Sequence, residues 1–135
     1  MAVPLFQNRS YTPRAEDFFT QAFRERLQFL PCYRLTGEDR SGAVLRGTVQ
    51  SVESYPVAVD SQFLALEYGL RVVVSLSLES RPDGRVLWQA ERVEDEVRFY
   101  ASSDPLLFQD NRREALKRLA WRLADRLLDQ LSLGF

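Results

Sequence analysis

The sequence of 135 residues contains no histidine and a single cysteine, Cys32. Histidine is the commonest general base and the commonest zinc ligand, so its absence argues against metal centres and against catalytic triads. A lone cysteine cannot form a disulfide within the chain, and it has no histidine to activate it as a nucleophile. We therefore interpret Cys32 as a buried structural thiol, and we expect no metal and no cofactor.

Long apolar runs are also missing, since none approaches the roughly eighteen residues that a membrane-spanning helix requires. No signal peptide is recognisable, because the residues before Cys32 include Arg24, Glu25 and Arg26 at helical spacing. If the natural protein is exported or lipidated, we expect the signal and the lipid-carrying residue to precede Met1.

Excess charge of either sign is the third absence, because 18 basic residues stand against 19 acidic ones. A net charge of −1 gives no long-range attraction for nucleic acid or for an anionic membrane surface, and no nucleic-acid partner is predicted. All the basic residues except Lys117 are arginines. That excess fits either bidentate anion recognition or, as we favour, a genome of high GC content.

The length of the chain fits one domain, 1–135, which can bury about two thirds of the surface that its unfolded form exposes. Residues 2–6 are predicted to form a short strand, and Thr12 is a candidate N-cap ahead of Pro13. Asn8 is expected to bond neighbouring amides and so to fix the angle between this strand and the next helix. That helix is predicted over 14–29 because apolar residues recur there at helical spacing: Phe18, Phe19, Ala22, Phe23, Leu27 and Leu30.

Arg26 is the exception on the apolar arc of this helix, since it lies near the middle of the arc. We favour the interpretation that its side chain extends to solvent along apolar neighbours. A contact with a buried anion or with a partner is the alternative.

Strands are predicted over 32–35, 43–55, 68–79 and 86–100. In 43–55 the alternation slips near Gln50 and Ser51, which indicates a bulge, and Pro56 is expected to end the strand. Residues 57–65 are predicted to be a loop or a strand extension, and 82–84 (Pro-Asp-Gly) a hairpin turn. The strand 68–79 alternates most clearly, and its core face is expected to carry Tyr68, Leu70, Val72, Val74, Leu76 and Leu78.

A loop is predicted over 101–111, with Asp110 or Asn111 as the N-cap of a final helix that ends before Gly134. The apolar stripe of this helix comprises Leu116, Leu119, Ala120, Leu123, Leu127 and Leu131. Trp121 lies away from the stripe. We interpret it either as a residue that packs at the rim of the stripe or as an exposed anchor for another protein.

The resulting order βαββββα predicts an α+β fold, with two helices packed on one face of a mixed, mostly antiparallel sheet of about four to five strands. The other face, which carries Arg71, Ser75 and Ser77, is expected to be open to a partner.

Acidic residues offer the only candidates for catalysis. Glu94, Asp95 and Glu96 are consecutive on a strand, so their side chains alternate between its faces, and we interpret them as a solvated edge. An enzyme using an acid/base pair remains a minor alternative, with candidates Asp17, Glu53, Asp60 and Glu67.

Several segments together resemble one family. They are "VPLFQNRSYTP" (3–13), "FTQAFRERL" (19–27), "AVLRGTVQSVESYP" (43–56), "LEYGLRVVVSLSLE" with "GRVLWQ" (66–89), and the ending from "DPLLFQDN" (104–131). In this order they are similar to the LptE family of outer-membrane lipoproteins, which assist lipopolysaccharide assembly. The resemblance extends over nearly the whole chain.

This resemblance implies a non-catalytic protein, anchored by a lipid on an upstream cysteine at the periplasmic side of the outer membrane. Its implied partner is the β-barrel protein LptD, inside which it acts as a plug and whose assembly it supports, with lipopolysaccharide as a further contact. The loops 57–62 and 106–111, where the family carries basic residues, have none here. The candidate contacts are therefore Arg71, Ser75, Ser77, Arg98, Arg112, Arg113 and Trp121.

Other envelope proteins share the short opening motif, and the alternatives are a CsgG-like or LpoB-like lipoprotein or a module similar to the amino-terminal domain of TolB. The Glu-Tyr strand and its "GRVLW" return favour the LptE family over them.

Overall fold

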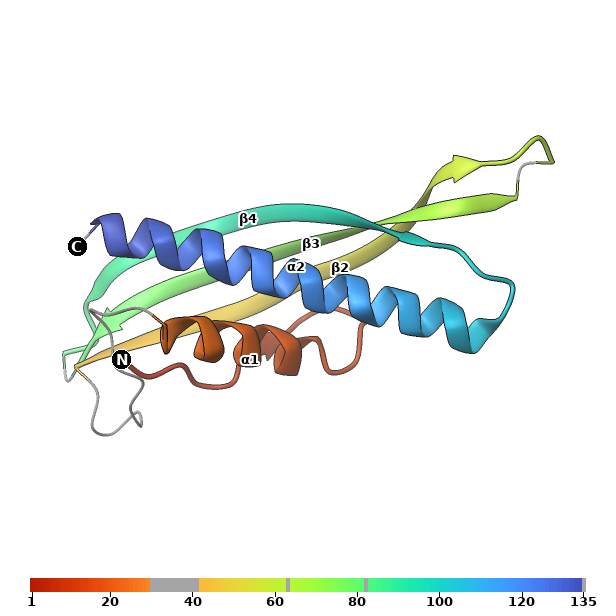
Figure 1. The fold of residues 1–135 in the computed structure, drawn as a ribbon. Helices are drawn as coiled ribbons and strands as arrows, with labels where there is room; N and C mark the ends of the chain where they lie inside the picture. The colour runs from red at the N-terminus through yellow and green to blue at the C-terminus, as the bar shows by residue number, and fades with distance from the viewer. Residues whose placement is uncertain (30–41, 63, 82, 135) are drawn as a thin grey trace.

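The computed structural model describes residues 1–29, 42–62, 64–81 and 83–134. Its elements follow the order β1 (Gln7–Asn8), α1 (Ala15–Leu27), β2 (Ala43–Val59), β3 (Ala65–Ser80), β4 (Val86–Tyr100) and α2 (Pro105–Gly134). Both helices lie over the same face of one sheet (Figure 1). The α+β prediction is thereby confirmed, while the strand predicted over 32–35 and the thiol of Cys32 lie outside the described residues.

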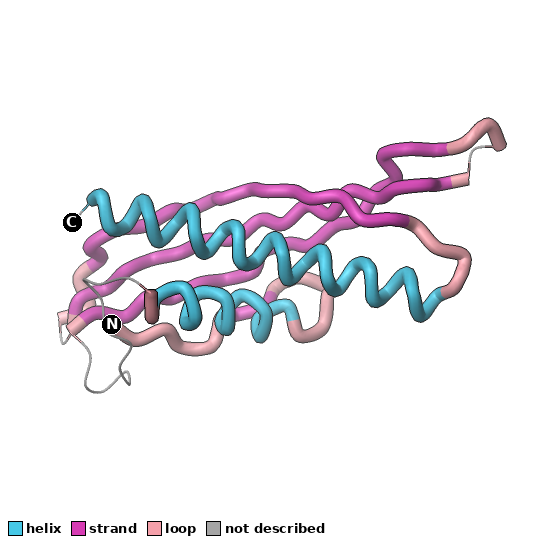
Figure 2. The backbone as a smooth tube through the Cα atoms, in the orientation of Figure 1, coloured by secondary structure: helices cyan, strands magenta, loops and turns pink. Residues whose placement is uncertain are grey.

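The sheet has four strands in the order β1-β2-β3-β4, as the smooth trace in Figure 2 shows for the three long strands. β1 pairs parallel with β2, and the other two pairings are antiparallel. The register of β2 against β3 shifts between Val49 and Ser51, so the predicted bulge is confirmed. β4 ends at Tyr100, opposite Glu67 of β3, and past this point β2 and β3 continue as a projecting two-stranded hairpin (Figure 1).

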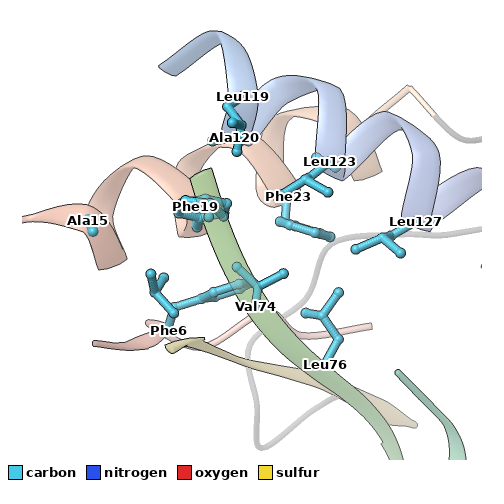
Figure 3. Packing of buried hydrophobic residues seen from close by; sticks show 14 of the residues in the cluster. Phe6, Ala15, Phe19, Phe23, Val74, Leu76, Leu119, Ala120, Leu123 and Leu127 are labelled. Atoms are coloured by element: carbon cyan, nitrogen blue, oxygen red, sulfur yellow. The ribbon is translucent and has the colours of Figure 1, made fainter. Parts of the chain in front are cut away.

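The core lies between the sheet and the helices. Alternate β3 residues from Leu70 to Leu78 are at most 3% exposed, which confirms the predicted core face. Phe19 and Phe23 of α1 meet these residues from above (Figure 3). The predicted stripe of α2 is buried along its whole length: Leu116, Leu119, Ala120, Leu123, Leu127 and Leu131.

The turn between β1 and α1 is held by the side chain of Asn8, as predicted. Its amide donates to the carbonyl of Thr12 at 2.9 Å and to Glu16 Oε2 at 2.7 Å. Its Oδ1 accepts the amide of Ser10 at 2.9 Å. One side chain thus joins the end of the strand to the first turn of the helix.

The predicted ends of the first strand and helix are wrong. The paired residues of β1 are Gln7 and Asn8 instead of 2–6, where Ala2 forms one isolated bridge to Val44. α1 begins at Ala15, after Arg14 in the left-handed conformation with φ 68°, and no side chain caps it. The predicted N-cap Thr12 is therefore wrong, and its hydroxyl oxygen instead accepts a hydrogen bond from Arg112 of α2.

Two further boundaries are corrected. Pro56 does not end the strand, and β2 continues to Val59. A proline is tolerated on a strand whose outer side is an edge, because no neighbouring strand needs its missing N–H. α2 begins at Pro105, five residues before the predicted N-cap Asp110. Asp104 caps it instead, since its Oδ1 accepts the amide of Leu106 at 3.0 Å.

Candidate interaction surfaces

The open face of the sheet, opposite the helices, carries four of the seven predicted contact residues. Arg71, Ser75 and Ser77 alternate along β3 with the buried core residues, so they point away from the helices. Arg98 lies opposite Gly69 in the β3–β4 register and therefore shares this face. Alternation along β3 was sufficient to place Arg71, Ser75 and Ser77 on one face, whereas the place of Arg98 depends on the register between β3 and β4.

The charges on the open face are paired with one another. Arg71 Nε lies 3.7 Å from Glu96 Oε2, and its guanidinium stands 5.5 Å from the centroid of the Tyr55 ring. Arg98 lies 3.5 Å from Glu67. The Tyr55 hydroxyl donates to Glu96, and this bond raises the pKa of Tyr55 above its ordinary value. Because Arg71, Glu96 and Arg98 are exposed, these ion pairs contribute little to stability, and the cluster forms a polar surface that a partner can contact.

A shallow hollow of about 410 Å³ lies beside this cluster on the open face. Ser75 and Ser77 of β3 line it, together with Thr48 of β2 and Gln89 of β4. Ser75 Oγ also accepts a hydrogen bond from Gln50 at 3.0 Å. The hydroxyl and amide groups of this lining can donate to or accept from a polar partner.

A second hollow, of about 500 Å³, lies between the start of α1 and the first half of α2. We call it the basic groove, because four of the residues that line it are cations and none is acidic: Arg14, Arg112, Arg113 and Lys117. Three of these cations have acidic neighbours on their own helices, at 3.3 to 3.7 Å.

Arg112 differs from the other cations of the basic groove in its partners. Its guanidinium donates to Ser54 Oγ and to Thr12 Oγ1, both at 2.9 Å. Desolvation by burial lowers the pKa of Arg112, although the group stays charged at neutral pH. Both of these acceptors are neutral hydroxyls, so an anionic ligand would add the charge compensation that they do not supply.

Trp121 and Arg26 form a contact between the two helices. The guanidinium of Arg26 lies 5.7 Å from the centroid of the Trp121 ring and pairs with Asp125. Trp121 remains 36% exposed. Arg26 therefore lies on the apolar arc of α1 because its guanidinium pairs with an acidic residue of α2. The rest of the Trp121 ring faces solvent.

The acidic candidates do not converge. Asp17 lies 3.7 Å from Arg14, and Glu67 pairs with Arg98. Asp60 accepts the amides of Gln62 and Leu64 at the tip of the projecting hairpin. Within the described part of the chain, no group of three or more metal-ligating residues lies together, and no helix is long and apolar enough to cross a membrane.

Sequence reasoning missed the basic groove. Arg112 and Arg113 were predicted contacts, whereas Arg14 and Lys117 were not, although both line the same hollow. Since Arg14 is far from α2 in the sequence, no local pattern could have joined it to the other three.

The chain is similar to one family of known proteins and to several solved structures. Residues 1–131 match the family model described as "LptE: Lipopolysaccharide-assembly". Among curated protein sequences, none matches the chain.

Solved structures with a similar fold include two lipoproteins. A putative lipoprotein from Caulobacter crescentus superposes with a TM-score of 0.65 at 16% identity, covering 96% of this chain and 87% of its own. The rare lipoprotein B from Shewanella oneidensis gives 0.64 at 18% identity, with coverage of 98% and 94%. PelC from Paraburkholderia phytofirmans, a dodecamer, gives 0.57 at 20% identity, with coverage of 94% and 83%. At these identities the similarity shows a shared fold.

Proposed function

Since the chain belongs to the LptE family of lipopolysaccharide-assembly proteins, we propose that it is a non-catalytic subunit of that machinery which plugs the LptD β-barrel and supports its assembly. The observation that carries the proposal is the family match over residues 1–131. The proposed location is the periplasmic side of the outer membrane, with a lipid on a cysteine upstream of Met1 as the anchor.

The open sheet face supports the proposed place inside a barrel. The interior of outer-membrane barrels is polar, unlike their lipid-facing wall. Arg71, Ser75, Ser77 and Arg98 give this chain a polar face whose charges are balanced by Glu96 and Glu67. We assign these four residues to the contact with the barrel, and Trp121 to a second contact on the helical side.

The basic groove supports a contact with lipopolysaccharide. Guanidinium groups bind phosphate through paired hydrogen bonds, and an ammonium adds a compact charge. Arg112 and Arg113 would receive a phosphate group of the glycolipid, with Lys117 and Arg14 at the rim of the same hollow. Three of these cations lie on α2, whereas the segments 57–62 and 106–111, where the family carries basic residues, have none in this chain.

A charge reversal tests the assignment of the open face. Arg71→Glu should reduce the yield of the complex with the barrel about fivefold or more, which corresponds to about 1 kcal/mol. The reason is that the new carboxylate would meet the partner where Arg71 now lies, and would also repel Glu96. Yield is measured by affinity capture of tagged chain co-expressed with the barrel.

The exchange variant Arg71→Glu/Glu96→Arg is the matched control, because it restores the ion pair within the sheet while altering the surface that the partner meets. The assignment predicts that the exchange variant also captures less barrel. Full recovery of the yield in the exchange variant, or an unchanged yield in Arg71→Glu, contradicts it.

A further inference from the structure

The outer edge of β4 is covered by a row of arginines from α2. Arg118 donates to the carbonyl of Arg98 at 3.2 Å, and Arg126 donates to the carbonyl of Glu94 at 3.4 Å. Between them, Arg122 donates to the carbonyl of Glu96. Every second carbonyl along this part of the strand thus receives a guanidinium, and every donor is four residues from the next.

Helix and strand geometry explain why the row fits. Four residues of an α-helix advance about 6.0 Å along its axis. Two residues of an antiparallel strand advance about 6.8 Å, and the carbonyls of alternate residues point to the same side. Residue numbers rise along α2 while the bonded numbers fall along β4, so the two elements run in opposite directions with nearly matched repeats.

Asp95 binds the central arginine of this row, Arg122, and lies near Arg126. Arg122 binds its carboxylate through two hydrogen bonds, at 2.7 and 2.8 Å, and Arg126 lies 4.0 Å away. The same carboxylate accepts the amide of Glu96 at 2.9 Å. Its side chain is only 16% exposed, so the prediction that the acidic run forms a solvated edge is wrong for Asp95.

Strand edges with free amides and carbonyls are templates for pairing with another strand. At Glu96 both the carbonyl and the amide are occupied, and at Glu94 and Arg98 the carbonyls are occupied. A strand approaching this edge would have to displace α2 arginines before it could form a ladder.

We propose that the β4 edge is a latent strand-pairing interface for a second copy of this chain, and that the arginine row of Arg118, Arg122 and Arg126 keeps it closed. Charge complementarity favours a second copy as the occupant. In an antiparallel pair of β4 strands centred on Glu96, Arg98 of each copy lies opposite Glu94 of the other, and these two pairs of opposite charge flank the one contact between like charges, Glu96 with Glu96. A symmetric pair of this kind makes the contact twice.

The test compares the triple variant Arg118→Gln/Arg122→Gln/Arg126→Gln with the intact chain. The variant should form dimers with a dissociation constant at least tenfold lower than that of the unchanged chain, measured by light scattering after size-exclusion chromatography across a range of concentrations. Deuterium uptake in peptides from β4 should fall on association. The control Arg9→Gln/Arg81→Gln/Arg85→Gln removes the same charge elsewhere and should behave like the unchanged chain.

Several results would overturn the proposal. The proposal is contradicted if the triple variant folds and stays monomeric. It is also contradicted if the variant associates while deuterium uptake in the β4 peptides stays unchanged. Association that persists after adding Glu94→Pro, which removes an amide at this edge, contradicts it as well. If the triple variant does not fold, Arg118→Gln/Arg122→Gln decides by the same measurements, because it frees the carbonyls of Arg98 and Glu96 while Arg126 still lies beside Asp95.

Discussion

Replacing Phe6 with alanine is expected to lower the free energy of unfolding by about 3–5 kcal/mol, the usual cost of removing a buried aromatic ring. The Phe6 side chain is 2% exposed, and its ring centroid lies 5.2 Å from that of Phe23 and 6.3 Å from that of Phe19. It therefore joins the amino-terminal segment to α1. Urea denaturation followed by circular dichroism measures the change.

A double-mutant cycle with Gly47 makes this prediction specific. A Cβ at Gly47 would stand 2.3 Å from the Phe6 ring, so Gly47→Ala alone should cost about 1–3 kcal/mol through overpacking. In the Phe6→Ala background the added methyl enters vacated space, and its cost should largely disappear. Gly42→Ala is the control, since nothing lies within 4 Å of a Cβ there. Additive effects of Phe6→Ala and Gly47→Ala would contradict this account of the packing.

The double variant Arg113→Glu/Lys117→Glu is expected to weaken lipopolysaccharide binding about a hundredfold. The estimate assigns about 1.5 kcal/mol to each of two lost hydrogen bonds to a charged group. Both residues line the basic groove but are exposed, so the fold should tolerate their replacement. Arg112 is left in place because it also ties α2 to Ser54 and Thr12. Fluorescence titration with labelled lipopolysaccharide measures the affinity.

The control for the groove is Arg85→Glu/Arg92→Glu, which makes the same change of charge away from this hollow. It should bind as the unchanged chain does, apart from a small effect of net charge that added salt screens. Equal loss of affinity in the two double variants would show that total charge, rather than the groove, determines binding.

Local periodicity accounts for the parts of the fold that the sequence predicted correctly. The core face of β3 and the stripe of α2 follow from patterns repeated within each element. The ends of elements were less predictable. α2 starts at the dipeptide Asp104–Pro105, which favours a helix start, whereas the N-cap predicted from the sequence was Asp110 or Asn111. Pro56 looked like a strand end because edge position cannot be read from local sequence.

The parts of the surfaces that the sequence did not predict depend on contacts between residues that are distant in the chain. Alternation along β3 predicted that Arg71, Ser75 and Ser77 would share a face. Their partners on β4, however, depend on the register between the strands. The arginine row on α2 was likewise invisible, since its acceptors are backbone carbonyls, which every residue possesses.

The central claim is that this chain is a non-catalytic subunit held by the LptD barrel. Affinity capture of the tagged protein from its native outer membrane, followed by mass spectrometry, tests the claim most directly. The account predicts that a large β-barrel protein is recovered in an equimolar amount. Recovery of a peptidoglycan synthase or of a secretion channel, with no barrel of the lipopolysaccharide machinery, would contradict it.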